Sequence, residues 1–591
     1  MEDIEIGNGR PTSPYNYSPT PMGTPRPMRI VVIGAGISGI AAVKLFRDQF
    51  FNQSVELVVY EKNKDVGGTW LENRYPGCAC DVPAHMYTYT WEGNPSWSKV
   101  YVGSAELFAF FKGRAVAYGV EEFLRLEHQV TEATWIDELG KWRVKVLNKK
   151  TGTYSYDETD VLINAAGFLN NWIWPKIPGL DTFQGQLIHS ANWQDNYDFG
   201  DKTIAVIGSG SSAIQIVPQL QPKVKHLTSF NRSKTWITSE FGQEFAPEGR
   251  TTEFSEEQKK IWAENPNAFF QYRKRVEANM NESFNWGFKT AEEQRNLLEQ
   301  SKKLMKGRLG GRKDLENILI PDFAVGCRRL VMRYSLGFLS LYGADIVYEI
   351  VLSPKLTRAF DRLTPGHGYL EALSSNNVSV RKDEISEVVA DGIKMKDNTI
   401  IPLDCIVCAT GFDTSYRPAF PLLGKKGKDL RTEWATNPRS YLSIAAQDFP
   451  NYFIIAGPNF PIANGSLIPS IEATIKYAFK AVAKMQREGI KCMVPKKAAI
   501  DDFQEHKDSL MRDLVWTSGC NSWYKDGQGA VWGPWCGSSL HFLELMSECR
   551  WEDWEFEGFS GNRFQYLGNG KTQREERKAD LAYYLTQNST S

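Results

Sequence analysis

The sequence predicts an α/β fold with two parallel-stranded units and a helical insertion, and three observations support this. One apolar run leads into the glycine pattern G-x-G-x-x-G at residues 34–39, and a second leads into G-x-G-x-x-A at residues 208–213. Each pattern is followed by a segment with helical character, which is the element order of a Rossmann-like unit. Farther on, residues 253–306 are highly charged and poor in strand formers, which predicts inserted helices.

The first unit is predicted from the order of its segments. Residues 29–33 suit a buried parallel strand, residues 40–50 suit a helix after the glycine loop, and residues 55–60 suit a second strand. The second strand ends in Glu61, 22 residues after Gly39. An acid at this place is typical of a dinucleotide-binding unit.

The loop of the first unit has the chemistry of a phosphate site. Gly34, Gly36 and Gly39 let the backbone approach a pyrophosphate, and the N-terminus of the next helix offers free N–H groups to it. Glu61 is placed to accept hydrogen bonds from a ribose. The pattern therefore predicts a bound dinucleotide without identifying it.

The second unit repeats this order with one difference. A strand over residues 203–207, a loop, a helix over residues 214–220 and a strand over residues 225–230 follow one another. The loop residues expected to contact a second dinucleotide are Gly208, Gly210, Ser211 and Ala213.

The difference lies at the end of the last strand. Arg232 and Ser233 stand where an NAD-binding unit carries an acid, and Arg232 is 19 residues after Ala213. A guanidinium and a hydroxyl suit a 2′-phosphate, which a carboxylate would repel. These residues predict NADPH rather than NADH; the alternative is a solvated basic turn.

Composition excludes some partners. The 591 residues carry 69 basic and 70 acidic side chains, a net charge of −1, which argues against a nucleic-acid or anionic-membrane partner. Residues 330–352 are fairly apolar but contain Arg333, Asp345 and Glu349, so no membrane span is expected there. The aromatic content of 13% fits either large cores or aromatic walls around a flat cofactor and an apolar substrate.

The nine cysteines show no zinc-ribbon spacing. Cys405 and Cys408 lie in an apolar, strand-like run, where alternation would point them to opposite faces. We therefore expect buried thiols there rather than a redox pair. Reduced cysteines fit an intracellular, cytoplasmic protein, and no metal site is expected.

Two further motifs carry a resemblance to a known family. Phe183, Gly185, His189 and Trp193 spell F-x-G-x-x-x-H-x-x-x-W between the two glycine loops. This resembles the fingerprint of type I Baeyer–Villiger monooxygenases, class B flavoproteins. Gln194 departs from it, because Pro or Asp is usual there. The resemblance implies that His189 supports the domain junction and cofactor handling.

The second motif covers residues 67–81 and resembles the family signature [AG]-G-x-W-x-x-x-x-[FY]-P-[GM]-x-x-x-D at every fixed position. In the family this stretch passes along the flavin, so the resemblance implies that the first loop binds FAD. It also makes Asp81 an acid near the flavin that pairs with a catalytic arginine. The residues expected to contact cofactor here are Gly68, Thr69, Trp70, Tyr75 and Asp81.

Residues 321–329 resemble the family segment that delivers that arginine. By this match Arg329 is the catalytic cation and Arg328 adjoins the NADPH phosphates. A permanently charged guanidinium suits the anionic flavin peroxide on which the family's chemistry depends. Residues 518–525 resemble the mobile loop that folds over NADP, with Trp523 as its anchor. The alternative for Trp523 is a buried tryptophan turn.

Small residues mark two expected chain crossings. Residues 165–167 (A-A-G) and 409–411 (A-T-G) resemble the paired segments that connect the flavin and nicotinamide domains of such flavoproteins. The implied division is a disordered tail over residues 1–27, a discontinuous FAD-binding domain over 28–170 and 409–591, and an NADPH-binding domain over 171–408. The helical insertion would span about residues 250–310 of the second domain.

The implied activity is an NADPH-consuming monooxygenation. One oxygen atom of O2 would be inserted next to the carbonyl of a ketone through a flavin peroxide, giving an ester or lactone. One alternative is an N- or S-oxygenating flavin-containing monooxygenase. A flavin disulfide reductase needs a redox pair, usually C-x4-C, and Cys78 and Cys80 have the wrong spacing.

An interruption gives a third alternative. In relatives the arginine segment runs almost directly into T-P-G-x-G-Y, which stands here at residues 364–369, so residues 330–362, 33 in number, intervene. We interpret this stretch as an insertion or as an intron translated in a mistaken gene model. A real insertion beside Arg329 could leave an inactive relative.

Sequencing the transcript tests the gene-model interpretation. The stretch has no turn residues or helical period that fit the surrounding strand pattern, so under the gene-model interpretation the message lacks the codons for residues 330–362. A message that encodes Tyr334 to Arg358 would refute that interpretation and make the insertion part of the protein.

Overall fold

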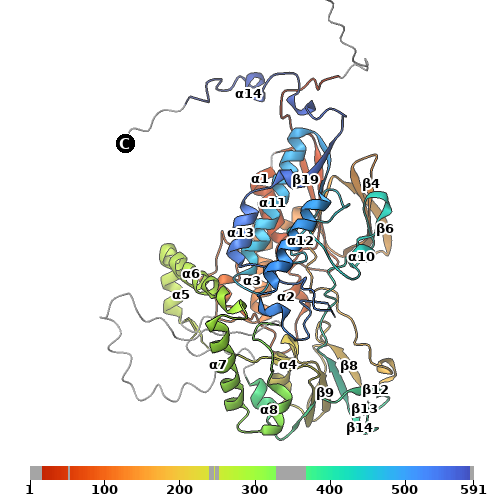
Figure 1. The fold of residues 1–591 in the computed structure, drawn as a ribbon, viewed down its shortest axis with the longest axis vertical. Helices are drawn as coiled ribbons and strands as arrows, with labels where there is room; N and C mark the ends of the chain where they lie inside the picture. The colour runs from red at the N-terminus through yellow and green to blue at the C-terminus, as the bar shows by residue number, and fades with distance from the viewer. Residues whose placement is uncertain are drawn as a thin grey trace, which may run out of the picture.

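The computed structural model describes residues 16–50, 53–238, 245–246, 252–327, 368–526 and 528–585, except the side chain of Ser283. Two parallel sheets lie in two lobes, one above the other in Figure 1. The predicted α/β fold with two parallel-stranded units is therefore confirmed.

The first sheet has the strand order β17-β7-β1-β2-β3, and its paired strands are parallel. Its central strand is the predicted apolar run, and Val31 and Val32 are fully buried. α1 (Ile37–Phe50) crosses from β1 to β2, as a parallel connection requires. The strands are β1 (Met28–Ile33), β2 (Val55–Tyr60), β3 (Leu124–Arg125), β7 (Val161–Asn164) and β17 (Tyr452–Ile454).

The second sheet has the order β11-β10-β9-β15-β8, again with parallel pairs. α4 (Ser211–Leu220) follows the second glycine loop. Cys405 and Cys408 are buried on opposite faces of β15, as predicted, and each contributes to a different apolar cluster. The strands are β8 (Gln186–His189), β9 (Thr203–Ile207), β10 (His226–Phe230), β11 (Val378–Arg381) and β15 (Cys405–Cys408).

Three smaller antiparallel or mixed sheets complete the strands. One packs beside the first parallel sheet, one beside the second, and a two-stranded ribbon lies near the C-terminus. They consist of β4 (His128–Ile136), β5 (Lys141–Asn148), β6 (Thr153–Thr159) and β16 (Leu422–Leu423); of β12 (Ile385–Val389), β13 (Gly392–Met395) and β14 (Ile400–Pro402); and of β18 (Ile490–Pro495) and β19 (Trp554–Gly558).

Helices form two groups in Figure 1. α11 (Leu467–Glu488), α12 (Lys497–Met511) and α13 (Ser539–Ser547) lie with α1 in the upper lobe, whereas α5 (Glu256–Glu264), α6 (Pro266–Asn281), α7 (Glu292–Arg308) and α8 (Lys313–Leu319) lie in the lower half. The remaining helices are α2 (Thr69–Glu72), α3 (Ser104–Ala117), α9 (Tyr369–Leu373), α10 (Leu430–Glu433) and α14 (Gln573–Glu576).

The charged segment forms helices because its caps are strong. The side chain of Ser255 accepts from Gln258 N at the start of α5, and that of Asn265 accepts from Ala268 N at the start of α6. Pro266 at the first position of α6 has no N–H to leave unpaired. Each cap satisfies one of the amides that a helix leaves open.

One apolar core is shared by both parallel sheets. Ile30 and Val32 of β1 belong to the same buried cluster as Ile204 and Val206 of β9. The residues that alternate with them belong to separate clusters, one beside each small sheet. Each parallel sheet thus has one face in the common core and one face in a core of its own, because successive strand side chains point to opposite faces.

The expectation that the cysteines are reduced is wrong for one pair. Cys327 and Cys520 form a disulfide between residues 193 apart in sequence, and the other seven cysteines are free. Spacing gave no signal for this pair, because disulfide connectivity cannot be deduced from sequence alone.

Residues 16–27, expected to belong to a tail, make specific contacts. Met22 N donates to Lys571 O over 2.8 Å, the side chain of Gln573 donates to Gly23 O, and Arg26 pairs with Asp160 at 2.8 Å. Residues 1–15 lie outside the described residues.

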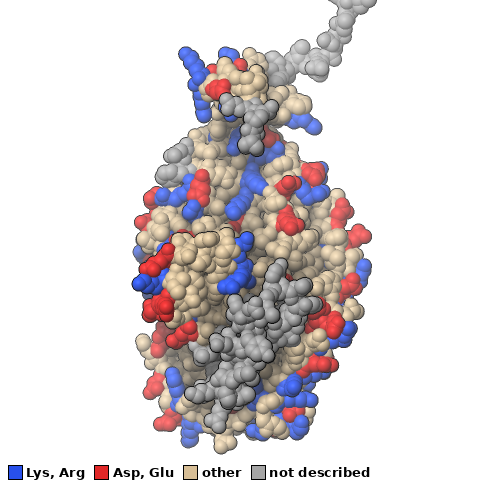
Figure 2. Space-filling view, turned by 90° about the vertical axis from the view of Figure 1, so that its left-hand side faces the viewer, with Lys and Arg blue, Asp and Glu red and all other residues tan. Residues whose placement is uncertain are grey.

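Surface charge is mixed. Figure 2 shows positive and negative side chains interspersed on one face of the molecule. Among the described residues, none of the helices combines the length and the apolar character that crossing a membrane requires.

His85 is buried among aromatic side chains. It lies in the short helix η1 (Ala84–Met86) and is 1% exposed. No protein group in the described ranges hydrogen-bonds to either ring nitrogen. Burial, and then the charge of Arg273, lower the pKa of His85 to about 3. Its ring meets four aromatic rings at 5.0–5.7 Å: Phe254, Trp262, Phe269 and Tyr272.

We expect His85→Phe to stabilise the protein, and more so in acid. The pKa of His85 in the folded state lies below the usual 6.5. The neutral ring therefore makes its full contribution to the free energy of unfolding above pH 6.5, and this contribution is lost as the pH falls toward 3. At pH 5 the loss from His85 is about 2 kcal/mol. Denaturant unfolding of wild type and H85F at pH 7.5 and pH 5 measures it.

The matched control is His226→Asn, because His226 is half-buried and its ring already lies 3.0 Å from the hydroxyl of Ser379. That variant removes a histidine elsewhere in the fold and leaves the aromatic surroundings of His85 unchanged. An equal difference between H85F and wild type at both pH values would show that His85 does not titrate as described.

Candidate active site

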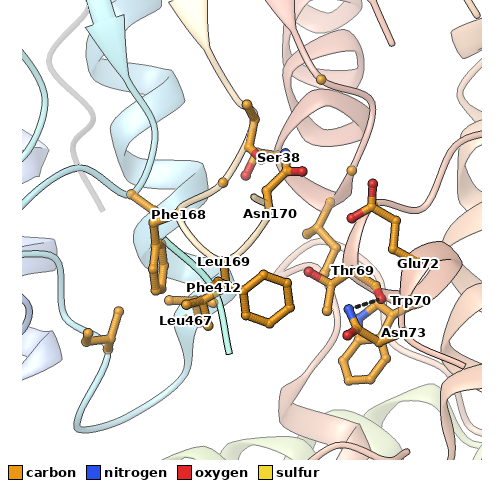
Figure 3. A pocket seen from close by; sticks show the side chains of 18 of the residues that line it. Ser38, Thr69, Trp70, Glu72, Asn73, Phe168, Leu169, Asn170, Phe412 and Leu467 are labelled. Atoms are coloured by element: carbon orange, nitrogen blue, oxygen red, sulfur yellow. Dashed lines mark hydrogen bonds between the residues drawn. The ribbon is translucent and has the colours of Figure 1, made fainter. Parts of the chain in front are cut away.

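One cavity of about 440 Å³ connects both glycine loops. Figure 3 shows its wall from close by, with Ser38 and Thr69 from the first lobe and with Phe168, Phe412 and Leu467 from three other segments. The residues at the loop tips follow the carboxyl ends of parallel strands, where ligands bind in open α/β sheets.

The first glycine loop is packed too tightly for side chains. A Cβ on Gly34, which has φ +101°, would lie 2.9 Å from the carbonyl oxygen of Ala165. A Cβ on Gly39 would overlap the carbonyl oxygen of Gly34. Gly36 lines the cavity and begins the turn whose amides have no partner within helix α1. The loop can therefore receive a phosphate group closely.

Glu61 connects this loop to the strand beside it. Its Oε2 accepts from Ala35 N and its Oε1 from Asn63 N, both over 2.8 Å, and it is 4% exposed. Burial raises the pKa of Glu61, against the lowering effect of the two N–H donors. Glu61 also lines the cavity, so the acid that holds the loop is available to a ribose.

The segment of the second family motif forms the floor between the loops. Gly68 and Thr69 begin helix α2, and Thr69 accepts a hydrogen bond from the side chain of Asn73 (Figure 3). Trp70 is buried, and its Nε1 has no partner among the described protein groups. Asp81 lines the same cavity. The predicted residues of this motif are thus brought together with those of the first loop.

Tyr75 and Gly77 connect this floor to the second unit. The Tyr75 hydroxyl donates to the side chain of Gln215 in α4 over 3.0 Å, and Gln215 donates to Ala79 O over 3.1 Å. A Cβ on Gly77 would lie 2.7 Å from the carbonyl oxygen of Gln215. Gln215 was not anticipated, and a lone glutamine in a helix gives no signal for such a junction.

The second glycine loop repeats the geometry of the first. Gly208 has φ +129°, and a Cβ there would overlap the carbonyl oxygen of Ala409. A Cβ on Gly210 would meet nothing within 4 Å. Ser211 lines the cavity at the start of α4, and Ala213 is fully buried behind it. The space beside Gly210 is where an approaching phosphate would lie.

Arg232 and Ser233 follow directly after β10, near the second loop. The Ser209 hydroxyl donates to Ser233 O over 2.8 Å, and the Thr235 hydroxyl donates to Ser209 O over 3.0 Å. Arg232 is exposed; the hydrogen bond from Lys396 does most to lower the pKa of Glu384, and the charge of Arg232 adds to it. A cation thus stands at the edge of the second nucleotide loop.

His189 lies outside the cavity wall, at the end of β8. Its Nδ1 accepts from Ala191 N over 3.1 Å, and its Nε2 is 3.4 Å from the hydroxyl of Thr410. Its ring stacks on Trp172 at 4.8 Å. Burial lowers the pKa of His189 to about 4, so the ring is neutral and supports the 409–411 crossing. Trp193 is buried and stacks on Phe199.

The segment that leads to the arginines is held by the helical insertion. Gln294 of α7 donates to Trp286 O and Val325 O and accepts from Val325 N. A Cβ on Gly326, which has φ +96°, would overlap the Trp286 ring, and both residues line the cavity. Arg328 and Arg329 lie outside the described residues, as does the stretch 330–362.

Gln294 and Trp286 were missed in the sequence. Gln294 belongs to a helix rich in charge, where polar residues are expected to face solvent, yet it is 4% exposed. Gly326 was the feature of the sequence that could have indicated a close contact here, because a conformation with positive φ favours glycine.

Trp523 also lines the cavity. Its ring is 5.6 Å from that of Phe168, which directly follows the 165–167 crossing, and both residues line the cavity. The Trp532 side chain donates to Trp523 O over 3.2 Å. Cys520, three residues before Trp523, carries the disulfide to Cys327.

The cavity suits two dinucleotides by its chemistry. It offers two helix N-termini, which bind phosphates through free amides, together with a buried ribose acceptor and several aromatic rings. Dinucleotides join phosphates to flat rings and riboses, and each of these groups finds a matching wall here.

Comparisons with known proteins agree with this arrangement. Residues 27–302 match the model of the flavin-binding monooxygenase-like family. The FAD-binding monooxygenase tazF of Aspergillus terreus is 38% identical over 96% of this chain and 96% of its own length. A Baeyer-Villiger monooxygenase of Streptomyces coelicolor is 30% identical over 87% and 90%.

Among solved structures, cyclohexanone monooxygenase from Rhodococcus sp. Phi1 bound to NADP+ has a TM-score of 0.71 at 23% identity and covers 90% of this chain and 100% of its own. This likeness supports the fold. The sequence relatives and the fold together show that this chain belongs to the flavin-binding monooxygenase-like family and, within it, to the type I Baeyer–Villiger group of class B flavoprotein monooxygenases.

Proposed function

We propose that this protein binds FAD and NADPH and inserts one oxygen atom of O2 next to the carbonyl of a small-molecule ketone. The products are an ester or lactone, NADP+ and water. One observation carries the proposal: both glycine loops, Asp81 and Gly326 line a single cavity, and Gly326 stands three residues before Arg329. The Streptomyces coelicolor relative named above supports the reaction class.

The first unit, residues 28–170 and 409–591, is proposed to bind FAD. Gly34, Gly36 and the start of α1 would receive the pyrophosphate, and Glu61 would accept from a ribose. Trp70, which lines the cavity, would contact the cofactor. When bound, FAD supplies the redox chemistry, accepting a hydride and transferring electrons to O2.

The second unit, residues 171–408, is proposed to bind NADPH. Gly210 and Ser211 would receive its pyrophosphate, and Arg232 with Ser233 its 2′-phosphate. Because Tyr75 binds Gln215 of the helix that starts at this loop, the two sites keep a fixed relation across the cavity floor. Trp523 would cover the nicotinamide side.

Arg329 and Asp81 are proposed as the catalytic pair. The guanidinium stays charged throughout the working pH range and can stabilise negative charge that develops on the substrate oxygen. The Asp81 carboxylate would orient it. His189 would act as a positioning residue, because its neutral ring supports the 409–411 crossing rather than touching the cavity.

Turnover of a ketone panel tests the proposal. With NADPH and O2, we expect ester or lactone from at least one cyclic or aryl ketone, identified by mass spectrometry. Arg329→Ala should lower product formation by about 100-fold or more, as expected when an anion-stabilising group is lost. An amine and a sulfide are assayed in parallel.

A clean N-oxide or sulfoxide without ester or lactone from any ketone would overturn the proposal in favour of an N- or S-oxygenating monooxygenase. NADPH oxidation without any oxygenated product would indicate the inactive relative. Repeating the assay with residues 330–362 deleted shows whether that stretch is compatible with activity.

Arg232→Ala should weaken the binding of NADPH and leave that of NADH nearly unchanged. Loss of a charge-assisted contact to a phosphate costs about 1.5–3 kcal/mol, so KM for NADPH should rise about tenfold or more while that for NADH stays nearly constant. Steady-state NADPH and NADH oxidation measure this ratio.

Lys225→Ala is the matched control, because Lys225 is an exposed cation directly before the amino end of β10, opposite Arg232. It should leave the preference for NADPH unchanged. Equal losses with both nucleotides in R232A would remove Arg232 from the 2′-phosphate site.

A further inference from the structure

The Cys327–Cys520 disulfide joins two walls of the cavity. Gly326, next to Cys327, lines one wall, and Trp523 and Tyr524, which follow Cys520, line the other. The two Cα atoms are 6.1 Å apart. The cysteines are 0% and 6% exposed, so both are buried.

Each wall has contacts of its own. Gln294 and Trp286 of the helical insertion hold the Cys327 side. On the Cys520 side, Trp532 N donates to Tyr524 O over 2.9 Å. The disulfide adds a covalent connection between these two sides, which also meet where Lys289 N donates to Asp513 O over 2.9 Å.

A lysine stands beside this pair. Lys525 Nζ lies 3.6 Å from Cys327 Sγ and also donates to Ser518 O. A cation at this distance stabilises a thiolate, which is the form that reacts with peroxides and disulfides. Burial lowers the pKa of Lys525, and the charge of Lys289 lowers it further.

Five free cysteines have thiols whose pKa burial raises, although the charge of a nearby lysine opposes this at Cys492, Cys536 and Cys549. The raised pKa disfavours the reactive form of all five thiols: Cys405, Cys408, Cys492, Cys536 and Cys549. Cys327 and Cys520 are thus distinguished by their disulfide and by neighbouring residues on each side that line the cavity.

We propose that Cys327 and Cys520 form a reversible redox site that fastens the Trp523 loop to the segment leading into Arg329. Hydrogen peroxide is the oxidant and a small dithiol is the reductant. The oxidised form holds the two walls together, and the reduced form lets them separate.

The chemistry balances in two steps. The Cys327 thiolate attacks peroxide, breaking the O–O bond to give a sulfenic acid and hydroxide. The Cys520 thiol then attacks that sulfur, an S–S bond forms, and the sulfenic oxygen leaves as water with the thiol proton. In reverse, a dithiol reduces the bond by two exchange steps and is itself oxidised to a cyclic disulfide.

Thiol counting and proteolysis of the full-length protein test the tether. After peroxide treatment and removal of peroxide, we expect seven titratable thiols in denaturant, and nine after the dithiol. Brief chymotrypsin digestion of the native protein should cut after Trp523 or Tyr524 several-fold faster in the reduced form. Nine thiols in the oxidised sample, or equal cleavage rates in both forms, would overturn the proposal.

Variants separate the reactive pair from a general effect of reduction. Cys520→Ser should be cleaved at the fast rate with or without peroxide, whereas Cys549→Ser, which removes a half-buried free thiol elsewhere, should respond as wild type does. Lys525→Met should slow peroxide oxidation of the pair about tenfold, the effect of one pKa unit on thiolate content. An unchanged oxidation rate in K525M would show that Lys525 does not promote oxidation of the cysteine pair.

The link to catalysis rests on the proposed function, and its readout is separate. NADPH oxidation and ester formation are compared in the oxidised and reduced forms, with a several-fold change expected. Equal turnover in both forms would overturn the link to catalysis. Absence of turnover in both forms, together with the expected thiol count and cleavage difference, would count against the proposed function and leave the tether standing.

Discussion

The structure depends on how closely two glycine loops approach two crossing segments. Gly34 lies against Ala165 and Gly208 against Ala409, and neither position has space for a side chain. Both glycines also have positive φ. At each place, the lack of space and the backbone conformation therefore both require glycine. These contacts fix the carboxyl ends of β1 and β9 beside the segments that carry the chain between the lobes. The cavity opens where these four segments meet.

Burial is the main cause of the shifted pKa values of His189, His85 and Glu61. His189 and His85 are held neutral by desolvation, and Glu61 stays in place through two backbone donors. The junction between the lobes includes the exposed ion pair of Arg74 with Asp195, whereas its buried contacts named above are made by neutral rings, amides and backbone groups. Such contacts keep their strength when salt changes, because screening acts on charges.

The α/β fold and the loop residues could be predicted because their constraints are local. A buried strand, a glycine turn and a helix follow one another within about thirty residues, and each requires particular residue types. Gln215, Gln294 and the Cys327–Cys520 pair could not be predicted, because their partners are distant in the chain. Gln294 and Gln215 look like ordinary helix residues, and their roles depend on which backbone groups the fold brings to them. Arg328 and Arg329 remain predictions, since they lie outside the described residues.

The alternation of β1 and β9 has a consequence for how the molecule can be divided. Ile30 and Val32 share a core with Ile204 and Val206, whereas Val31 and Ala205 each belong to a core of one lobe only. A cut at the boundary between the nucleotide units would expose the whole common face to water. The two halves therefore have separate sheets but bury a common apolar face against each other. When one half is exchanged between relatives, the apolar residues that face it on the other half must be exchanged as well.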